Sequence, residues 1–269
     1  MAIQPVAVAY KNMLETVNGP VTPTATGTSW VNPDRMYDRV RSRLAKTAAI
    51  PSGISAIVID QGPTVGDYLS PGIVILGPSH NLASGSPITV EYNSADSWPG
   101  TTVTSLETSG TLTAGIAWWN RFSQVTAGAG NRYWRISFTK TDAIPEIGEL
   151  FLSTRIVLGQ SELVEDGGAT SPAEFPITRN IVVARTLAGV RTSTKLGVER
   201  RSFNLRASAL NATAKSDWHS FLVGIEWGHL PFFFHDPIND MWFAEGDLRG
   251  RSLDNPERWD MQIDLEEVV

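Results

Sequence analysis

The residues of this sequence best suited to chemistry are its 4 histidines and the carboxylates beside them. His235 and Asp236 follow three consecutive phenylalanines in "FFFHDP", and a histidine oriented by an aspartate is the general base of many hydrolases. Adjacent residues on a strand point to opposite faces, so these two side chains cannot easily orient each other. We therefore interpret the stretch as a buried strand and a turn, with a turn or interface histidine. The other histidines show no spacing typical of zinc sites: His80, His219 and His229.

Other catalytic signatures are absent from the sequence. It has no G-x-S-x-G elbow, no P-loop and no Rossmann fingerprint after a strand. With 0 cysteines it has no disulfide, thiolate metal site or cysteine nucleophile. A glycosidase needs two carboxylates, but with 28 Asp and Glu some pair always lies close in sequence. We expect no enzyme, no metal and no cofactor, and keep a glycan hydrolase as the second alternative function.

Tryptophans are better candidates for ligand contact, because 9 of them are present and their rings stack well at wet recognition surfaces. Trp98 lies in "NSADSWPGTT", which is typical of an exposed loop. Trp118 and Trp119 are adjacent, so one should point inward and the other outward. We predict a glycan or partner contact at Trp98 and at the outward member of the pair. Simple packing of these rings is the alternative.

Composition predicts a globular, turn-rich protein of two domains. The chain has 269 residues, 42% hydrophobic and 19% charged, with 23 Gly and 16 Pro. A net charge of −6 argues against specific binding to nucleic acid, which requires neutralised phosphates. No segment approaches the roughly 18 apolar residues of a membrane span, and the N-terminus lacks the pattern of a signal peptide. We expect a soluble protein made in the cytoplasm.

The first 160 residues predict an arm followed by a jelly roll or β-sandwich. In residues 1–50, Met36, Val40 and Leu44 fall at helical spacing, which predicts a short helix within an N-terminal arm. Residues 51–160 contain short β-branched and aromatic runs bounded by turn residues, which predict a sandwich that could include part of 20–50. Residues 161–176, acidic with two prolines, are the predicted linker, with a surface loop as the alternative.

Residues 177–269 predict a second β domain with one amphipathic helix. The helix is indicated by apolar residues at i, i+3, i+4 and i+7, namely Trp218, Phe221, Leu222 and Ile225. Strands are predicted from "ERRSFNLRA", "PFFFHDP", "DMWFAEGDL" and "RWDMQIDLEEVV".

Charge is distributed unevenly in this second domain. Its first part is basic, and its last part is acidic. Opposite strips of this kind suit head-to-side contacts between identical copies, the geometry that closes rings. The alternative is that the two strips meet within one subunit. The candidate inter-subunit residues are Arg185, Arg191, Arg200, Arg201, Phe233, Asp260, Asp264 and Glu266.

One resemblance covers roughly residues 20–158. The segments "GIVILGPSHNLASGSPITVEYNSAD", "NRYWRISFTK" and "IGELFLS" resemble the discoidin-type, galactose-binding-like jelly roll. The resemblance implies that fold. It implies no particular ligand, because members bind sugars, lipids or proteins through variable loops.

A second resemblance covers about residues 175–269. The order "ERRSFNLRA", amphipathic helix, "PFFFHDP", "DMWFAEGDLR", "RWDMQIDLEEV" is similar to tail-hub domains of long-tailed bacteriophages, in particular distal tail and minor tail proteins. This implies a tail-tube-like β-barrel or sandwich that assembles into a ring, expected to be hexameric, within the virion. In well-known distal tail proteins the ring-forming domain comes first, whereas here the predicted order is reversed.

The resulting functional hypothesis is a structural component of a phage tail tip or baseplate. The ring would join the tail tube to the adsorption apparatus, with tail-tube and tail-tip proteins as partners. The jelly roll would be displayed toward a partner protein or a cell-surface glycan. A carbohydrate-binding adhesin module without a ring is the first alternative.

Overall fold

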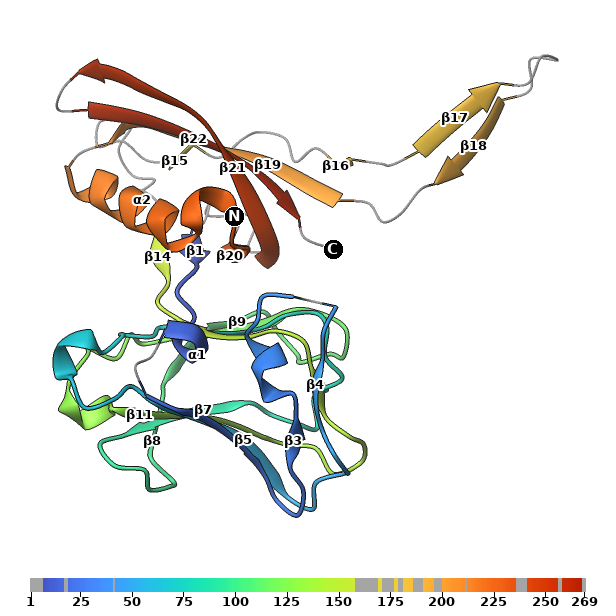
Figure 1. Ribbon diagram of the computed structural model, residues 1–269, viewed down its shortest axis with the longest axis vertical. Coiled ribbons are helices and arrows are strands. Elements are labelled where there is room, and N and C mark those ends of the chain that lie inside the picture. Colours follow the sequence, from blue (N-terminus) through green and yellow to red (C-terminus); the bar gives the residue numbers. More distant parts are fainter. Residues whose placement is uncertain are drawn as a thin grey trace. The chain divides into compact units, whose positions relative to one another are not determined.

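The structure is a computed structural model that describes residues 7–16, 19–40, 42–157, 169–170, 177–178, 181–185, 191–195, 200–210, 212–235, 241–255 and 258–267. Within these ranges the chain is mostly β, which confirms the predicted fold class. The chain divides into two compact units (Figure 1). We call Ala9–Ile156 the sandwich unit, and Met1–Val8 with Val157–Val269 the helix–sheet unit.

The sandwich unit encloses its core between two antiparallel sheets. One sheet has the order β2-β5-β11-β7-β8, with β2 (Val21–Ala25), β5 (Ile54–Asp60), β11 (Tyr133–Thr139), β7 (Thr89–Asn93) and β8 (Thr101–Thr102). The other has the order β13-β6-β10-β9, with β13 (Leu150–Ser153), β6 (Ile73–Leu76), β10 (Trp118–Phe122) and β9 (Ser105–Thr108). A third sheet, β12-β4-β3, contains β12 (Glu146–Ile147), β4 (Ala45–Thr47) and β3 (Trp30–Val31). Short helical turns complete the unit: α1 (Met13–Thr16), η1 (Pro33–Met36), η2 (Val65–Asp67) and η3 (Ala129–Asn131).

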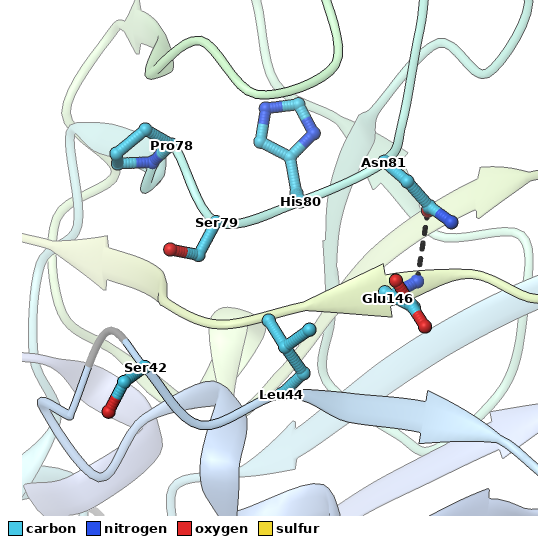
Figure 2. A pocket seen from close by; sticks show the side chains of 7 residues that line it. All are labelled: Ser42, Leu44, Pro78, Ser79, His80, Asn81 and Glu146. Carbon is cyan, nitrogen blue, oxygen red and sulfur yellow. Dashed lines mark hydrogen bonds between the residues drawn. The ribbon is translucent and has the colours of Figure 1, made fainter.

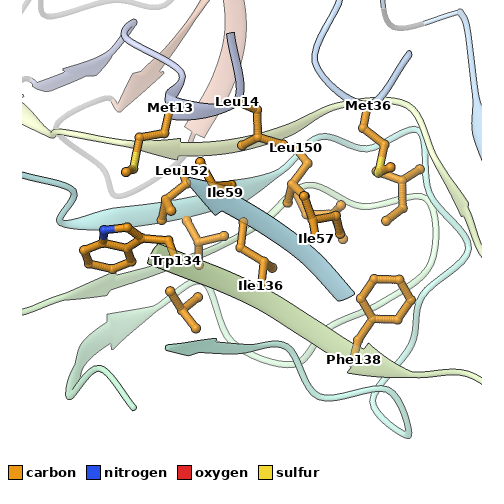
Figure 3. Packing of buried hydrophobic residues seen from close by; sticks show 14 of the residues in the cluster. Met13, Leu14, Met36, Ile57, Ile59, Trp134, Ile136, Phe138, Leu150 and Leu152 are labelled. Atoms are coloured by element: carbon orange, nitrogen blue, oxygen red, sulfur yellow. The ribbon is translucent and has the colours of Figure 1, made fainter. Parts of the chain in front are cut away.

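Strand β11 shows why the sequence folds in this way. Its residues alternate, so that Trp134, Ile136 and Phe138 point inward and are at most 3% exposed. Figure 3 shows these three side chains packed in the cluster that also contains Ile57 of β5 and Leu152 of β13. The predicted inward face of this strand is confirmed.

Within residues 1–50, the described part does not form the separate arm that the sequence predicted. Strands β2, β3 and β4 belong to the sheets of the sandwich unit, and the predicted helix is reduced to the turn η1. Arg39 has a φ of 58°, which ends any right-handed helix there. Its guanidinium instead binds Glu15, 24 residues away. A tertiary ion pair thus overrides the local periodicity.

The helix–sheet unit contains an eight-stranded sheet. Seven strands follow the order β14-β1-β20-β21-β22-β19-β15, and β16 also pairs with β19. Their bounds are β14 (Ile156–Val157), β1 (Ala7–Ala9), β20 (Phe232–His235), β21 (Met241–Asn255), β22 (Arg258–Glu267), β19 (Arg200–Leu210), β15 (Ala169–Thr170) and β16 (Ile177–Thr178). The predicted linker therefore contains a strand of this sheet, while its other residues lie outside the described ranges.

The predicted amphipathic helix is present as α2 (Ala212–Gly224), followed by the turn η4 (Glu226–Gly228). The four apolar residues that predicted it are each 0% exposed: Trp218, Phe221, Leu222 and Ile225. Phe221 packs edge-to-face on Phe232 of β20, with ring centroids 4.9 Å apart. Helix α2 therefore covers the sheet face that carries Phe232.

Candidate assembly and contact surfaces

The phenylalanine strand β20 is an internal strand of its sheet. It pairs with β21, and Phe233 packs on Phe243 with ring centroids 4.9 Å apart. Phe232, Phe233 and Phe234 are at most 1% exposed, and His235 is 2% exposed. A subunit contact through Phe233 would therefore first have to uncover its ring. Asp236 lies outside the described residues.

The basic and acidic strips occupy neighbouring strands of one sheet. Strand β19 pairs antiparallel with β22, which places Ser202 opposite Glu266 and Asn204 opposite Asp264. Arg200 and Arg201 lie at the start of β19, opposite β16. The register thus places the strand that carries Arg200 and Arg201 beside the acidic strand β22 within one chain.

One sheet face is also acidic across β21 and β22. Glu245 lies opposite Glu266, and Asp247 lies opposite Asp264. These four residues alternate with Ala244 and Leu265, which belong to the buried face. By register these four carboxylates share one side of the sheet, and β22 also pairs with the arginine-bearing strand β19. Asp260 lies farther along β22, opposite Ser252.

The other two predicted arginines lie on a hairpin formed by β17 (Ile181–Arg185) and β18 (Arg191–Lys195). These strands pair with each other and with no other described strand (Figure 1). Arg185 lies directly opposite Arg191 in the pair that closes the hairpin. An isolated two-stranded hairpin is marginally stable in water, and opposed like charges weaken it further. Both features favour a hairpin that is stabilised by a partner surface.

Trp118 and Trp119 are both buried, which corrects the prediction of one outward ring. They are 8% and 2% exposed. Trp118 belongs to the core cluster and donates its indole N–H to the Gly110 carbonyl oxygen at 3.1 Å. The prediction assumed that one face of β10 is open to solvent. Neither ring offers a stacking face to a sugar.

Trp98 lies in the loop between β7 and β8 and is half-buried. Its indole N–H donates to Asp96 Oδ1 at 2.9 Å, and the Arg135 guanidinium lies 4.8 Å from its ring centroid. Arg135 in turn forms an ion pair with Glu91 at 2.5 Å. The ring is therefore held in one orientation without being fully buried, which is the arrangement of a preorganised contact residue.

A second stacked arginine, three positions earlier in the chain, lies over Tyr133 on the outer face of this sheet. The Arg132 guanidinium lies 4.9 Å from the centroid of Tyr133 and binds Asp60 at 2.7 Å and 2.8 Å. The hydrogen bond from Arg132 is the main cause that lowers the pKa of Asp60. Because both arginines on this face are paired with carboxylates, the face has no excess positive charge.

His80 lies in a pocket of about 330 Å³ but is held by structural contacts. Its Nδ1 accepts from the Leu82 N–H at 3.1 Å, so Nε2 carries the proton that is donated to the Ile116 carbonyl oxygen at 2.9 Å. Burial lowers the pKa of the ring, which favours this neutral form. Figure 2 shows the neighbouring Asn81 bonded to the backbone of Glu146. Among the described residues that line the pocket, Glu146 is the one carboxylate, whereas a glycosidase requires a pair.

Sequence reasoning missed a buried charge cluster in the sandwich unit. Glu149 is 0% exposed, and neither carboxylate oxygen has a hydrogen-bond partner within the described part of the chain. The nearby Val40 N–H donates instead to Asp38 Oδ1 at 2.9 Å. Burial, with the negative charges of Asp38 and Glu15, raises the pKa of Glu149 to about 9. The charge of Arg39 opposes this shift.

Two further findings concern membrane spans and metal sites. Among the helices that the structure describes, none is long and apolar enough to cross a membrane. The described side chains form no group of three or more His, Asp or Glu that could hold a metal ion.

Comparisons with known proteins show a distant likeness. No family model and no curated protein matches the chain. Two similar solved structures are of a GH29 fucosidase from Ruminococcus gnavus in complex with fucose, one of them a mutant. Each has 19% identity and a TM-score of 0.41, and the match covers 54% of this chain and 27% of the fucosidase chain. The chain thus spans little more than a quarter of that enzyme, and these comparisons assign it to no family.

Proposed function

We propose that this chain is a structural protein of a phage tail tip, and that its helix–sheet unit assembles copies into a ring. The single observation that carries the assembly is the β17–β18 hairpin, which pairs with no other described strand and closes on two opposed arginines. The tail-tip location rests on the sequence resemblance to tail-hub domains. The sandwich unit would be displayed for a partner or receptor, and no catalytic role is proposed.

The assembly follows from two kinds of incomplete surface. One is the arginine-bearing β17–β18 hairpin, which pairs with no other described strand, and the other is the exposed surface of Val223, Glu226 and Trp227 at the end of α2. Two different patches that fit each other make a heterologous contact between copies, and such contacts close into rings when the rotation allows. Charge complementarity would fix the register of the contact.

The test is the mass of the full chain in solution, measured by light scattering after size exclusion. At low salt we expect several times the monomer mass of 29.3 kDa. At about 1 M salt, where exposed charges are screened beyond about 3 Å, the assembly should dissociate. A monomer at low salt, even at the highest concentration reached, would contradict the proposal.

A second candidate function is carbohydrate binding by the sandwich unit. The observation that favours it is the half-buried Trp98 ring, which Arg135 and Asp96 hold in place. Because the arginines of this face are paired with carboxylates, we expect neutral rather than sialylated or sulfated sugars. Aromatic rings stack well on the apolar faces of such sugars.

Trp98→Ala should weaken binding to a neutral glycan by about tenfold or more, since a central tryptophan often contributes over 1.4 kcal/mol. Trp98→Phe, which keeps a ring, should retain most of the affinity. A glycan array identifies the ligand, and calorimetry on the two variants measures the loss. Equal affinity of the alanine variant and the wild type would exclude Trp98 as the contact.

A further inference from the structure

Helix α2 and the turn after it carry an exposed apolar stripe on the side away from the core. His219 and Val223 lie four residues apart on one face of α2, and the Trp227 ring, which follows in η4, stands beside His219. Val223 is 51% exposed and Trp227 is 49% exposed. A surface helix is usually polar on this side, so the stripe requires an explanation.

The tryptophan of this stripe lies in a strained segment of backbone. Glu226 and Trp227 have φ values of 49° and 60°, so two consecutive non-glycine residues are left-handed. Each such residue costs about 1–2 kcal/mol. The Trp227 ring stands edge-on to His219, with centroids 6.1 Å apart. Strain of this kind persists mainly at functional positions, and here it presents a large apolar ring to solvent.

The stripe has the chemistry to receive the hairpin described above. Asp217 and Glu226 are exposed carboxylates in the stripe's own segment. The hairpin combines an apolar strand, "IVVA" in β17, with the arginine pair at its closed end. The two surfaces are complementary in hydrophobicity, because an apolar strand meets an apolar stripe. They are also complementary in charge, because arginines meet carboxylates.

We propose that the stripe of His219, Val223 and Trp227 is the docking surface for the β17–β18 hairpin of a second copy of this chain. The inference rests on the proposed assembly and names its acceptor surface. Each copy then has one hairpin and one stripe, and successive copies join head to side. Trp227 is the expected centre of the contact, because tryptophan is the residue type most enriched among interface hot spots.

The stripe variant is Val223→Ser with Trp227→Gly. Glycine adopts the left-handed conformation without strain, so this change removes the ring and relieves the backbone at once. We expect the variant to fold with unchanged or higher thermal stability and to be monomeric. Trp227→Phe alone, which keeps a ring, should still assemble.

The hairpin variant is Arg185→Ser with Arg191→Ser. It should also be monomeric, because its hairpin lacks the charges that bind the acceptor. An equimolar mixture of the two variants should form a dimer of two chains and nothing larger, since one copy supplies an intact stripe and the other an intact hairpin. Light scattering on the single variants and on the mixture measures this.

The outcomes separate the acceptor from the assembly itself. If the stripe variant assembles like the wild type while the hairpin variant does not, the stripe is not the acceptor, although the proposed assembly stands. Loss of assembly in Glu245→Ser with Asp264→Ser, alongside an intact stripe variant, would place the acceptor on the acidic sheet face instead. A monomeric wild type would overturn both proposals.

Discussion

Glu149→Gln should stabilise the sandwich unit, and the gain should grow as the pH rises. The folded pKa of Glu149 is raised from 4.5 to about 9, so the folded state holds a proton that the unfolded chain releases. The stability that this proton provides is complete below pH 4.5 and is lost progressively up to about pH 9. Since one pKa unit corresponds to about 1.4 kcal/mol, the wild type loses on the order of 3 kcal/mol by pH 7. The Glu149→Gln variant avoids this loss of stability, because an amide does not ionise.

The measurement is urea unfolding of the two proteins at several pH values between 4.5 and 9. Asp142→Asn is the matched carboxyl-to-amide control. The hydrogen bond from Lys140 lowers the pKa of Asp142, so its contribution is present above its ordinary pKa and lost as the pH falls. The control should therefore show no gain at alkaline pH. Parallel stability curves for Glu149→Gln and the wild type would contradict the proposed burial of a protonated carboxyl.

Arg39→Met should destabilise the same unit by about 1.5–3 kcal/mol, the usual contribution of hydrogen bonds to a charged group, because Arg39 is buried while its partner Glu15 is partly exposed. The Arg39 side chain is 7% exposed and binds Glu15 through Nε at 2.9 Å and Nη2 at 2.7 Å. Nη2 also donates to the Tyr10 carbonyl oxygen at 2.9 Å. Without the guanidinium, the partly exposed Glu15 carboxylate would lose its partner while it still faces the negative charge of Asp38.

The matched control is Arg43→Met. Arg43 pairs with Asp38 at 3.5 Å, and its side chain is 60% exposed. Such surface pairs contribute about 0–1 kcal/mol, so the unfolding midpoint should change little. Equal losses in the two variants would show that the Arg39 pair is no more important than a surface contact.

Periodic features of the fold could be predicted from the sequence, because burial repeats along the chain. The four apolar residues of α2 fall at helical spacing, and Trp134, Ile136 and Phe138 alternate on β11. Both patterns record one face packed on a core. The predicted domain boundary near residue 160 also lies close to the division between the two units at Ile156 and Val157.

Features that depend on distant partners could not be predicted in this way. Met36, Val40 and Leu44 have helical spacing, but the Arg39–Glu15 ion pair fixes a different backbone. Glu149 stands beside an apolar strand in "EIGELFLS", and nothing local indicates that it is 0% exposed. The pairing of β19 with β22 spans about 60 residues and is set by the whole sheet.

The candidate contact residues also divide into those that local sequence indicates and those that depend on distant contacts. Trp98 was identified from loop chemistry, whereas the burial of Trp119 depends on packing that adjacency in sequence does not reveal. Trp227 carries no sequence signal of its left-handed backbone, which becomes visible only in the structure.

The most direct test of the proposed assembly is negative-stain electron microscopy of the full chain at low salt. We predict closed rings, in which every copy contacts two neighbours through different surfaces. Class averages should show one rotational symmetry, and the hairpin variant Arg185→Ser with Arg191→Ser should yield isolated particles under the same conditions. Isolated wild-type particles, or two-fold dimers in which both copies use the same surface, would contradict the account.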